Sequence, residues 1–228
     1  MADNIARVFA AATAPDPTRP LLTWYDDATG ERTELSGATC ANWVAKTANL
    51  LVDGLGLGPG DTAAVLLPPH WQTAAVLLGT WSAGLGVAGD PGDVDVLFVA
   101  AGRLAEADAW SAGDRYVLAL DPFALPMRQV PPGFADFVSE VRVHGDHFTP
   151  YAAGGEEPVE RARRRADELG IARDDRVLID TGAYPDPVDW LLAPLAAGAS
   201  TVLCANLDPA RVESRAAAEQ VTRTVGRT

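Results

Sequence analysis

Apolar runs of strand length alternate with helical patterns over most of the chain. Residues 62–67 (TAAVLL) form a continuous apolar run, as in a strand that is covered on both faces. A helical pattern follows at 71–83, and Gly84 stands where that helix should end. The alternation predicts an α/β fold with a mostly parallel sheet and helices on both faces.

The other helices and strands are predicted from the same two kinds of pattern, apolar runs of strand length and helical spacing. Strands at 21–26 and 31–35 flank a turn at Thr29-Gly30 and predict an N-terminal β-hairpin. A helix follows, capped by Ser36 and ended by Gly54. Further strands are expected at 94–100, 115–120, 176–179 and 201–204, and further helices at 103–110, 156–169, 188–197 and 209–224.

A weak internal repeat links the two halves of this pattern. Each copy begins with a Leu-Gly pair. An aspartate stands five positions after the glycine of this pair, and the glycine of an Ala-Gly pair stands 28 positions after it. The constant spacing favours a true structural repeat, built from parallel strands with right-handed crossovers. The matched positions are Gly56, Asp61 and Gly84 in the first copy and Gly170, Asp175 and Gly198 in the second.

The domain organisation expected from this pattern is simple. We expect a single α/β domain over residues 1–228, with two related halves at 1–120 and 156–228. The segment 121–155 between them is rich in proline and is expected to be irregular.

Neither a membrane span nor a signal peptide is expected. Residues 62–89 carry no charge, but Pro68-Pro69 and Gly84 limit the helix to 13 residues. At 1.5 Å per residue such a helix is about 20 Å long, against a hydrocarbon core of about 30 Å, so a buried helix is predicted. Residues 1–14 lack the basic and then apolar order of a signal peptide and predict a short amphipathic helix.

Composition narrows the class of partner. The 228 residues include 18 Lys+Arg and 31 Asp+Glu, for a formal net charge of −13. This balance disfavours nucleic acids and membranes as partners, because both need clustered positive charge on the protein. The two cysteines, Cys40 and Cys204, show no motif spacing, which fits a reducing compartment and predicts a cytoplasmic protein.

Glycines and histidines form two motif-like stretches that we interpret as structural. The glycines at 54–60 do not fill the G-x-G-x-x-G pattern and end a helix, so they predict a turn. His144, Asp146 and His147 could supply metal ligands, but residues 141–151 alternate like a strand, which places positions three apart on opposite faces. A polar hairpin is expected there, and no metal site is predicted.

Charged stretches in the second half also favour a structural interpretation. The arginines of 161–165 alternate with alanine and acidic residues, which is typical of a solvated helix face. Asp174-Asp175 precedes a strand, and Asp175 has a repeat partner in Asp61, so a turn-forming role is expected rather than catalysis.

The best position for a pocket follows the strand at 176–179. Ligands of open α/β sheets bind beyond the carboxyl ends of the strands, and the loop 181–187 (TGAYPDP) occupies that place. We expect Thr181, Tyr184 and Trp190 to bind a ligand there, with core packing as the alternative for Trp190. No catalytic residue is predicted.

Two stretches of the chain resemble a known enzyme family. Residues 21–91 contain LGLGPGDTAAVLLPP after the hairpin and helix, and residues 175–203 end in PLAAGASTVL. Both are similar to segments of the AMP-forming acyl-CoA synthetases and their adenylate-forming relatives, L-G-x-x-x-G-D-x-V and P-L-x-x-G-A-x-x-V-L. The resemblance covers about half of the chain in collinear order and implies the N-terminal part of such an enzyme, in a short form.

The motif with which that family binds ATP has no match in this sequence. The resemblance implies an ATP loop, S-G-T-T-G-x-P-K-G, before the second stretch, where residues 150–169 hold only Ala153-Gly154-Gly155. Charge on the transferring phosphates needs backbone donors, Lys or Arg, and usually Mg²⁺. The only lysine, Lys46, matches no lysine of the family, whose C-terminal domain is expected beyond Thr228. No functional residue carries over.

Three functional hypotheses result. The favoured one is a truncated, non-catalytic relative of the acyl-CoA synthetases, without a cofactor, that binds a small acyl or nucleotide-like ligand or a protein. The alternative is an enzyme that activates a carboxylic acid with ATP and Mg²⁺, alone or with a partner chain. The third is an interaction subunit that forms a homodimer, because a truncated sheet exposes apolar edges.

Overall fold

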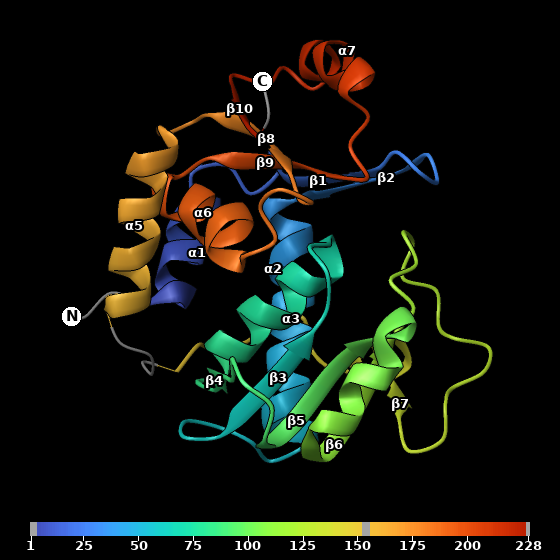
Figure 1. Cartoon of the computed structure of the whole chain (residues 1–228). Helices are drawn as coiled ribbons and strands as arrows, with labels where there is room; N and C mark the ends of the chain where they lie inside the picture. The colour runs from blue at the N-terminus through green and yellow to red at the C-terminus, as the bar shows by residue number, and fades with distance from the viewer. Residues whose placement is uncertain (1–3, 152–155, 227–228) are drawn as a thin grey trace. The chain divides into compact units, whose positions relative to one another are not determined.

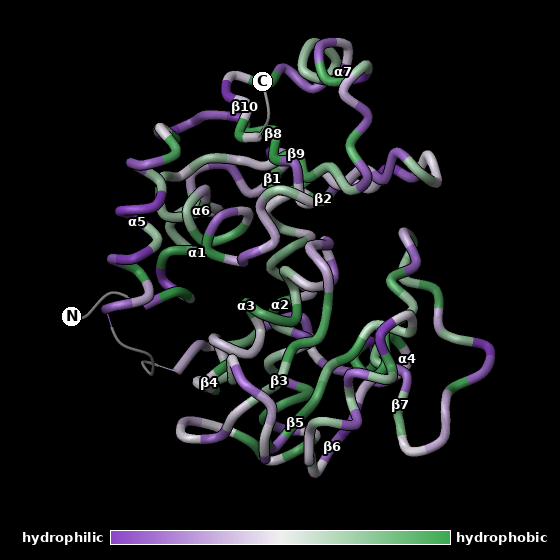
Figure 2. The backbone as a smooth tube through the Cα atoms, in the orientation of Figure 1, coloured by the Kyte–Doolittle hydropathy of each residue, from purple (hydrophilic) through white to green (hydrophobic). Residues whose placement is uncertain are grey.

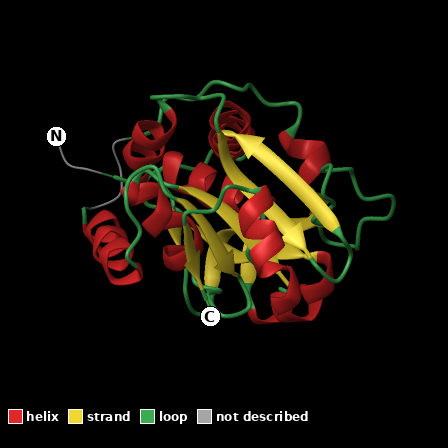
Figure 3. Cartoon of the chain, turned by 90° about the horizontal axis from the view of Figure 1, so that it is seen from above, coloured by secondary structure: helices red, strands yellow, loops and turns green. Residues whose placement is uncertain are grey.

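The computed structural model describes residues 4–151 and 156–226 (Figure 1). By their internal contacts the residues form two compact units, 1–40 with 155–228, and 41–154. Each unit holds one five-stranded, mostly parallel sheet, and the strands lie among helices (Figure 3). The predicted α/β class is therefore confirmed, with the strands divided between two sheets. That the two units make a single domain stays a prediction.

The sheet of the first unit has the strand order β10-β8-β9-β1-β2. The predicted hairpin of β1 and β2 is confirmed, and it belongs with the second half of the chain, because β1 pairs in parallel with β9. The elements of this unit are α1 (Ile5–Thr13), β1 (Pro20–Asp26), β2 (Glu31–Ser36), α5 (Glu157–Leu169), β8 (Arg176–Asp180), the π-helix η3 (Val188–Leu192), α6 (Ala193–Ala197), β9 (Ser200–Ala205), the 3-10 helix η4 (Pro209–Arg211), α7 (Val212–Ala218) and β10 (Arg223–Val225).

The two faces of this sheet are covered differently. α1, α5 and α6 lie on one face and α7 on the other (Figure 1). On the α7 side, Leu178, Val202 and Cys204 form a small buried cluster against Tyr25 and Val221. Because side chains alternate along a strand, the neighbouring buried residues of β8 and β9 face α1, α5 and α6. They include Val177, Ile179 and Leu203.

The sheet of the second unit is parallel throughout, in the order β4-β3-β5-β6-β7. The backbone of β3 and of the second half of β5 is coloured mainly as apolar (Figure 2), as expected for strands covered on both faces. The elements are α2 (Gly37–Asn49), which begins in the first unit, the π-helix η1 (Leu50–Gly54), β3 (Thr62–Leu66), α3 (Trp71–Ser82), β4 (Gly86–Val87), β5 (Asp93–Ala100), the 3-10 helix η2 (Ala101–Ala109), β6 (Ser111–Leu118), β7 (Ala135–Asp136) and α4 (Phe137–Val141).

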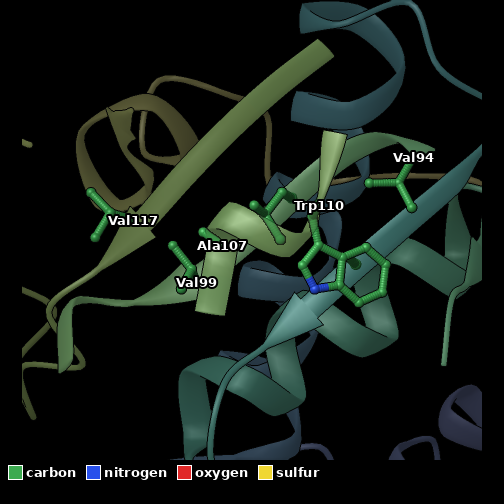
Figure 4. Packing of buried hydrophobic residues seen from close by; sticks show 7 residues of the cluster. Val94, Val99, Ala107, Trp110 and Val117 are labelled. Carbon is green, nitrogen blue, oxygen red and sulfur yellow. The ribbon is translucent and has the colours of Figure 1, made fainter. Parts of the chain in front are cut away.

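The core of the second unit has a layer on each face of β5 and β6. On one face Val99 and Val117 pack with Ala107 of η2 and with Trp110 (Figure 4). On the other face the buried ring of Phe98 stacks on Tyr116 of β6, with 5.6 Å between the ring centroids, and Phe137 of α4 meets Phe98 edge-on at 5.8 Å.

The predicted repeat is confirmed in the local geometry of both copies. In each copy the aspartate carboxylate accepts a hydrogen bond at 2.7 Å from the backbone N–H three residues earlier. Its carbonyl accepts another at 2.9 Å from the N–H 25 residues later. Asp61 and Asp175 therefore form equivalent turns in front of β3 and β8, as predicted. The four glycines of the pattern, Gly56, Gly84, Gly170 and Gly198, all have left-handed φ values, between 64° and 82°.

The C-terminal segment differs from the predicted helix at 209–224. The helix α7 ends at Ala218, and the chain continues into β10, which pairs in parallel with β8. At the end of α7 the Glu219 side chain turns to arginines of the sheet, and Gln220 takes a left-handed φ of 54°. Tertiary ion pairs and strand pairing therefore outweigh the helix propensity of the sequence.

The segment 121–150 is less irregular than predicted. It contains β7 and the short helix α4, whose N-cap is Asp136; the carboxylate accepts a hydrogen bond from the Ser139 N–H at 2.8 Å. Phe137 and Val141 of α4 are buried, which gives this helix its stability. Residues 152–155, the end of the predicted linker, lie outside the described residues.

The helix predicted as buried rather than membrane-spanning is α3, and nearly all of its residues are buried in the second unit. Within residues 4–151 and 156–226, no helix is both long and apolar enough to cross a bilayer.

Candidate functional site

The loop after β8 is shaped by hydrogen bonds that use its polar groups. Thr181 is buried, and both its N–H and its hydroxyl donate to the carbonyl of Cys204, each at 3.0 Å. These bonds fasten the end of β8 to β9. The Thr181 hydroxyl thus has a structural partner in the position where the sequence predicts a ligand.

Tyr184 and Trp190 occupy different environments around the same loop. The Trp190 side chain is buried, with 1% of the residue exposed, and its indole N–H donates to the carbonyl of Pro185 at 3.2 Å. Core packing, the alternative for Trp190, therefore describes its position. Tyr184 is half-buried, so it is the one of the three that offers surface to a ligand. A ligand-binding role for Thr181, Tyr184 and Trp190 stays a prediction.

A groove of about 300 Å³ lies beside this loop. Arg165 Nε donates to Asp189 at 2.6 Å, and Arg161 Nη2 donates to Asp186 at 3.3 Å, so ion pairs connect α5 to the loop. The arginine run is an exposed, ion-paired helix face, as predicted. The lining comprises Arg161, Arg164, Arg165, Glu168, Asp186, Val188 and Asp189.

A second groove, of about 520 Å³, lies at the α7 face of the same unit. It is bordered by the first residues of three parallel strands and by the chain that follows α7. Three arginines and three carboxylates line it, so it is strongly polar but electrically balanced. The lining comprises Arg19, Pro20, Arg32, Glu34, Asp174, Arg176, Ser200, Ala218, Glu219, Gln220 and Thr222.

The buried carboxylate of Glu219 is the centre of this second groove. It accepts hydrogen bonds from the Tyr25 hydroxyl at 2.6 Å, from Arg32 Nη2 at 2.9 Å and Nε at 3.1 Å, and from Arg176 Nη2. Burial alone would raise the pKa of Glu219, but the hydrogen bonds from Tyr25, Arg176 and Arg32 outweigh it and lower the pKa below its ordinary value. Glu219 is therefore held ionised.

A second ion pair anchors the last turn of α7, four residues before Glu219. Arg215 is buried and donates to the Asp27 carboxylate, with Nη1 at 3.1 Å from Oδ2, and to Cys204 Sγ at 3.4 Å. Its guanidinium carbon also lies 4.2 Å from the centroid of the Tyr25 ring. The hydrogen bonds from Arg215 lower the pKa of Asp27, while burial raises the pKa of Cys204 to about 11.

Sequence reasoning missed this arginine–carboxylate network, although local signals for it exist. Arg32 and Glu34 stand two apart on β2, and Arg215 and Glu219 stand four apart at the end of the chain. These spacings place each pair on one face of a strand or helix. Glu219 and Arg215 lie more than 180 positions from Tyr25, Arg32 and Asp27, so no local pattern connects the two ends of the network.

The histidine stretch lies in the turns that follow α4. Among the described residues no group of three or more His, Cys, Asp or Glu side chains could hold a metal. The predicted strand and polar hairpin at 141–151 are wrong, because α4 ends at Val141 and turns follow. Asn49 of α2 donates to the carbonyls of Gly145 and His147 at 2.7 and 3.0 Å and fixes these turns, leaving the His147 side chain 99% exposed.

The start of α5 stands where the resemblance implies a phosphate loop. Glu157 and Glu160 lie in its first turn, next to Pro158. The N-terminus of a helix binds phosphate because its free N–H groups and its dipole attract negative charge. Carboxylates in the first turn repel such a ligand. Ala153-Gly154-Gly155, just before this helix, lie outside the described residues.

Acyl-CoA synthetases are among the solved structures that share this fold. The Brucella canis acyl-CoA synthetase matches with a TM-score of 0.75 and 17% identity over 98% of this chain and 47% of that chain. Acetoacetyl-CoA synthetase from Streptomyces lividans matches with a TM-score of 0.73 and 16% identity over 96% of this chain and 41% of that chain. The N-terminal domain of FACL13 from Mycobacterium tuberculosis matches with a TM-score of 0.65 and 15% identity over 97% of this chain and 62% of that chain.

These matches show a shared fold, that of the N-terminal part of adenylate-forming enzymes, as the two sequence motifs imply. The chain spans about half the length of the first two synthetases or less. No family model matches the sequence. A TIGR03089 family protein of Mycobacterium tuberculosis (strain ATCC 25618 / H37Rv) is 47% identical over 226 residues, which cover 92% of this chain and 93% of that protein. At this identity and coverage, the chain belongs to the TIGR03089 family.

Proposed function

We propose that this protein is a non-catalytic, cytoplasmic relative of the acyl-CoA synthetases that acts by binding a small ligand or another protein. The observation that carries the proposal is the acidic first turn of α5, with Glu157 and Glu160. A polyphosphate seated at this helix start would meet two carboxylates beside the free N–H groups, and their negative charge opposes the attraction of the helix dipole. The position is therefore unfavourable for ATP.

The arginines further along α5 support the same proposal. Arg165 is engaged by Asp189 and Glu168, and Arg161 by Asp186. Adenylate transfer needs cations that stabilise the charge of the reacting phosphates. Guanidinium groups already paired with carboxylates supply little of that stabilisation, and the net charge of −13 opposes polyphosphate binding further.

A binding role fits what the fold retains. The sheet, the crossover helices and the loop 181–187 are all present, and two grooves of about 300 and 520 Å³ lie in the unit formed by residues 1–40 and 155–228. Small-molecule sites typically have volumes of about 300–1,000 Å³. The scaffold therefore offers room for a ligand without the charges that adenylation requires.

The test is an assay of pyrophosphate release. The purified protein is incubated with ATP, Mg²⁺ and a panel of carboxylic acids, with an acyl-CoA synthetase of the same fold as the positive control. We expect no release above the protein-free background. Release that depends on the protein and is lost in Thr181→Ala or Tyr184→Phe would overturn the proposal and support the alternative, activation of a carboxylic acid with ATP.

A further inference from the structure

We propose that the sheet surface beneath α7 is a carboxylate-binding site which the chain's own Glu219 occupies, and that a small organic acid competes with Glu219 for it. The inference rests on the proposed binding function and names a ligand class and a place for it. Release of α7 would be the consequence of binding.

The first support is the geometry of the site around Glu219. Side chains from three strands converge on one carboxylate: Tyr25 of β1, Arg32 of β2 and Arg176 of β8. Arginine forks and a phenol hydroxyl recognise a carboxylate by direction as well as by charge. The same donors would accept the carboxylate of a ligand in the same way.

The second support is that the donors are fixed by the sheet and not by Glu219 alone. Arg176 Nη2 also donates to the Thr23 hydroxyl at 2.9 Å. Arg32 Nε donates to the Tyr25 hydroxyl at 2.9 Å, and Arg32 Nη2 donates to Glu34 at 2.7 Å. The arginines therefore keep their orientation when Glu219 leaves, and a preorganised site loses little entropy when it binds a new ligand.

The third support is the room and the unused donors beside Glu219. The groove of about 520 Å³ is large enough for a small molecule. Arg19, Ser200 and Thr222 on its wall already donate to Asp174 or Asp175, so the unused donors are those of the other two arginines. Arg32 Nη1 and Arg176 Nη1 donate no hydrogen bond to any residue in the described ranges. The site thus fits an organic acid with a second polar group, such as a dicarboxylate.

The fourth support is the way α7 is attached. The only buried residue of this helix is Arg215, and Glu219 follows directly after its end. α7 is therefore held to the sheet by Arg215 and by Glu219, whose backbone carbonyl also accepts a hydrogen bond from Arg176 Nε at 2.6 Å, more than by apolar packing. A ligand that takes the place of the Glu219 carboxylate removes one of these attachments. Cys204, which is fully buried and in contact with Arg215, then becomes accessible.

The experiment measures thiol accessibility during a titration with succinate. The wild-type protein is titrated at constant ionic strength, with chloride as the replacement ion, and labelled with a thiol-reactive disulfide. Labelling of Cys204 and Cys40 is quantified separately by mass spectrometry. Cys40 is also buried, in α2, and reports on global unfolding. We expect a saturable rise of tenfold or more in the labelling rate of Cys204, with Cys40 unchanged.

A variant isolates the site from the rest of the chain. In Glu219→Ala the internal carboxylate is gone, so succinate should bind at least tenfold more tightly by calorimetry, and Arg176→Gln in this background should abolish binding. Glu213→Ala, on an exposed position of the same helix, is the matched control and should behave as the wild type.

The proposal is overturned if a folded Glu219→Ala shows no saturable succinate binding, or if succinate changes Cys204 and Cys40 labelling equally. If Glu219→Ala does not fold, the wild-type titration decides alone: no saturable rise at Cys204 overturns the proposal. None of these outcomes involves pyrophosphate release, so failure here is distinguishable from failure of the proposed function.

Discussion

Replacing Arg215 with methionine is expected to lower the free energy of unfolding by about 3–5 kcal/mol. Its partner Asp27 has a side chain that is only 4% exposed, and that of Arg215 is 7% exposed. Methionine fills much of the volume but leaves the Asp27 carboxylate without its main counter-charge, and a buried, unpaired charge is costly. Urea denaturation followed by circular dichroism measures the loss.

The matched control for this substitution is Arg211→Met. Arg211 also pairs with Asp27, at 3.4 Å, but its side chain is 54% exposed. Exposed ion pairs contribute about 0–1 kcal/mol, so this variant should stay within 1 kcal/mol of the wild type. Similar losses in both variants would show that burial of the ion pair is not the cause.

The pH dependence of the Arg215→Met deficit separates charge from packing. In the wild type the pKa of Asp27 is lowered by the hydrogen bonds from Arg215. The stability that ionised Asp27 contributes is therefore present above the pKa of the unfolded chain, about 3.9, and is lost as the pH falls through the pKa of the folded protein. In the variant, burial without Arg215 should raise the pKa of Asp27 instead. The difference in the free energy of unfolding between the wild type and Arg215→Met is then largest at pH 7 and decreases towards pH 3.5. A difference that does not change with pH would indicate lost packing.

Gly79→Ala is expected to destabilise the second unit by about 2 kcal/mol. A Cβ at Gly79 of α3 would lie 2.5 Å from Cβ of Thr47, a fully buried residue of α2. A change of rotamer does not move a Cβ, so the helices must separate. Overpacking of this kind costs about 3 kcal/mol, which exceeds the gain of about 1 kcal/mol from replacing a helical glycine by alanine.

The control for this prediction is Gly102→Ala in η2, where an added Cβ meets nothing within 4 Å. That variant should be as stable as the wild type or slightly more stable. Both are measured by urea denaturation of the same preparation. A Gly79→Ala protein as stable as the Gly102→Ala protein would contradict the close approach of α2 and α3.

Local sequence patterns were sufficient to predict most helices and strands and the internal repeat. The turns at Asp61 and Asp175 depend on glycines and aspartates at fixed spacing, which the sequence displays directly. The partner of the β1–β2 hairpin was not predictable, because pairing of β1 with β9 joins residues about 180 positions apart. The early end of α7 was missed for a related reason, since Glu219 is held by distant arginines that override helix propensity.

The site was predicted less well than the fold. The loop after β8 lies where a ligand is expected, but the Thr181 hydroxyl and the Trp190 indole have partners within the protein. Sequence spacing does not tell whether a polar group is used by the fold. The network around Glu219 was missed because Tyr25 and Arg176 come from strands far apart in the chain.

We propose that this protein has the fold of an acyl-CoA synthetase N-terminal part without the capacity to hold a nucleoside triphosphate. Isothermal titration of the protein with Mg²⁺ and ATP tests it directly, beside an acyl-CoA synthetase titrated under the same conditions. We expect no saturable heat from this protein at concentrations that saturate the synthetase. Saturable one-to-one binding of ATP would contradict the account.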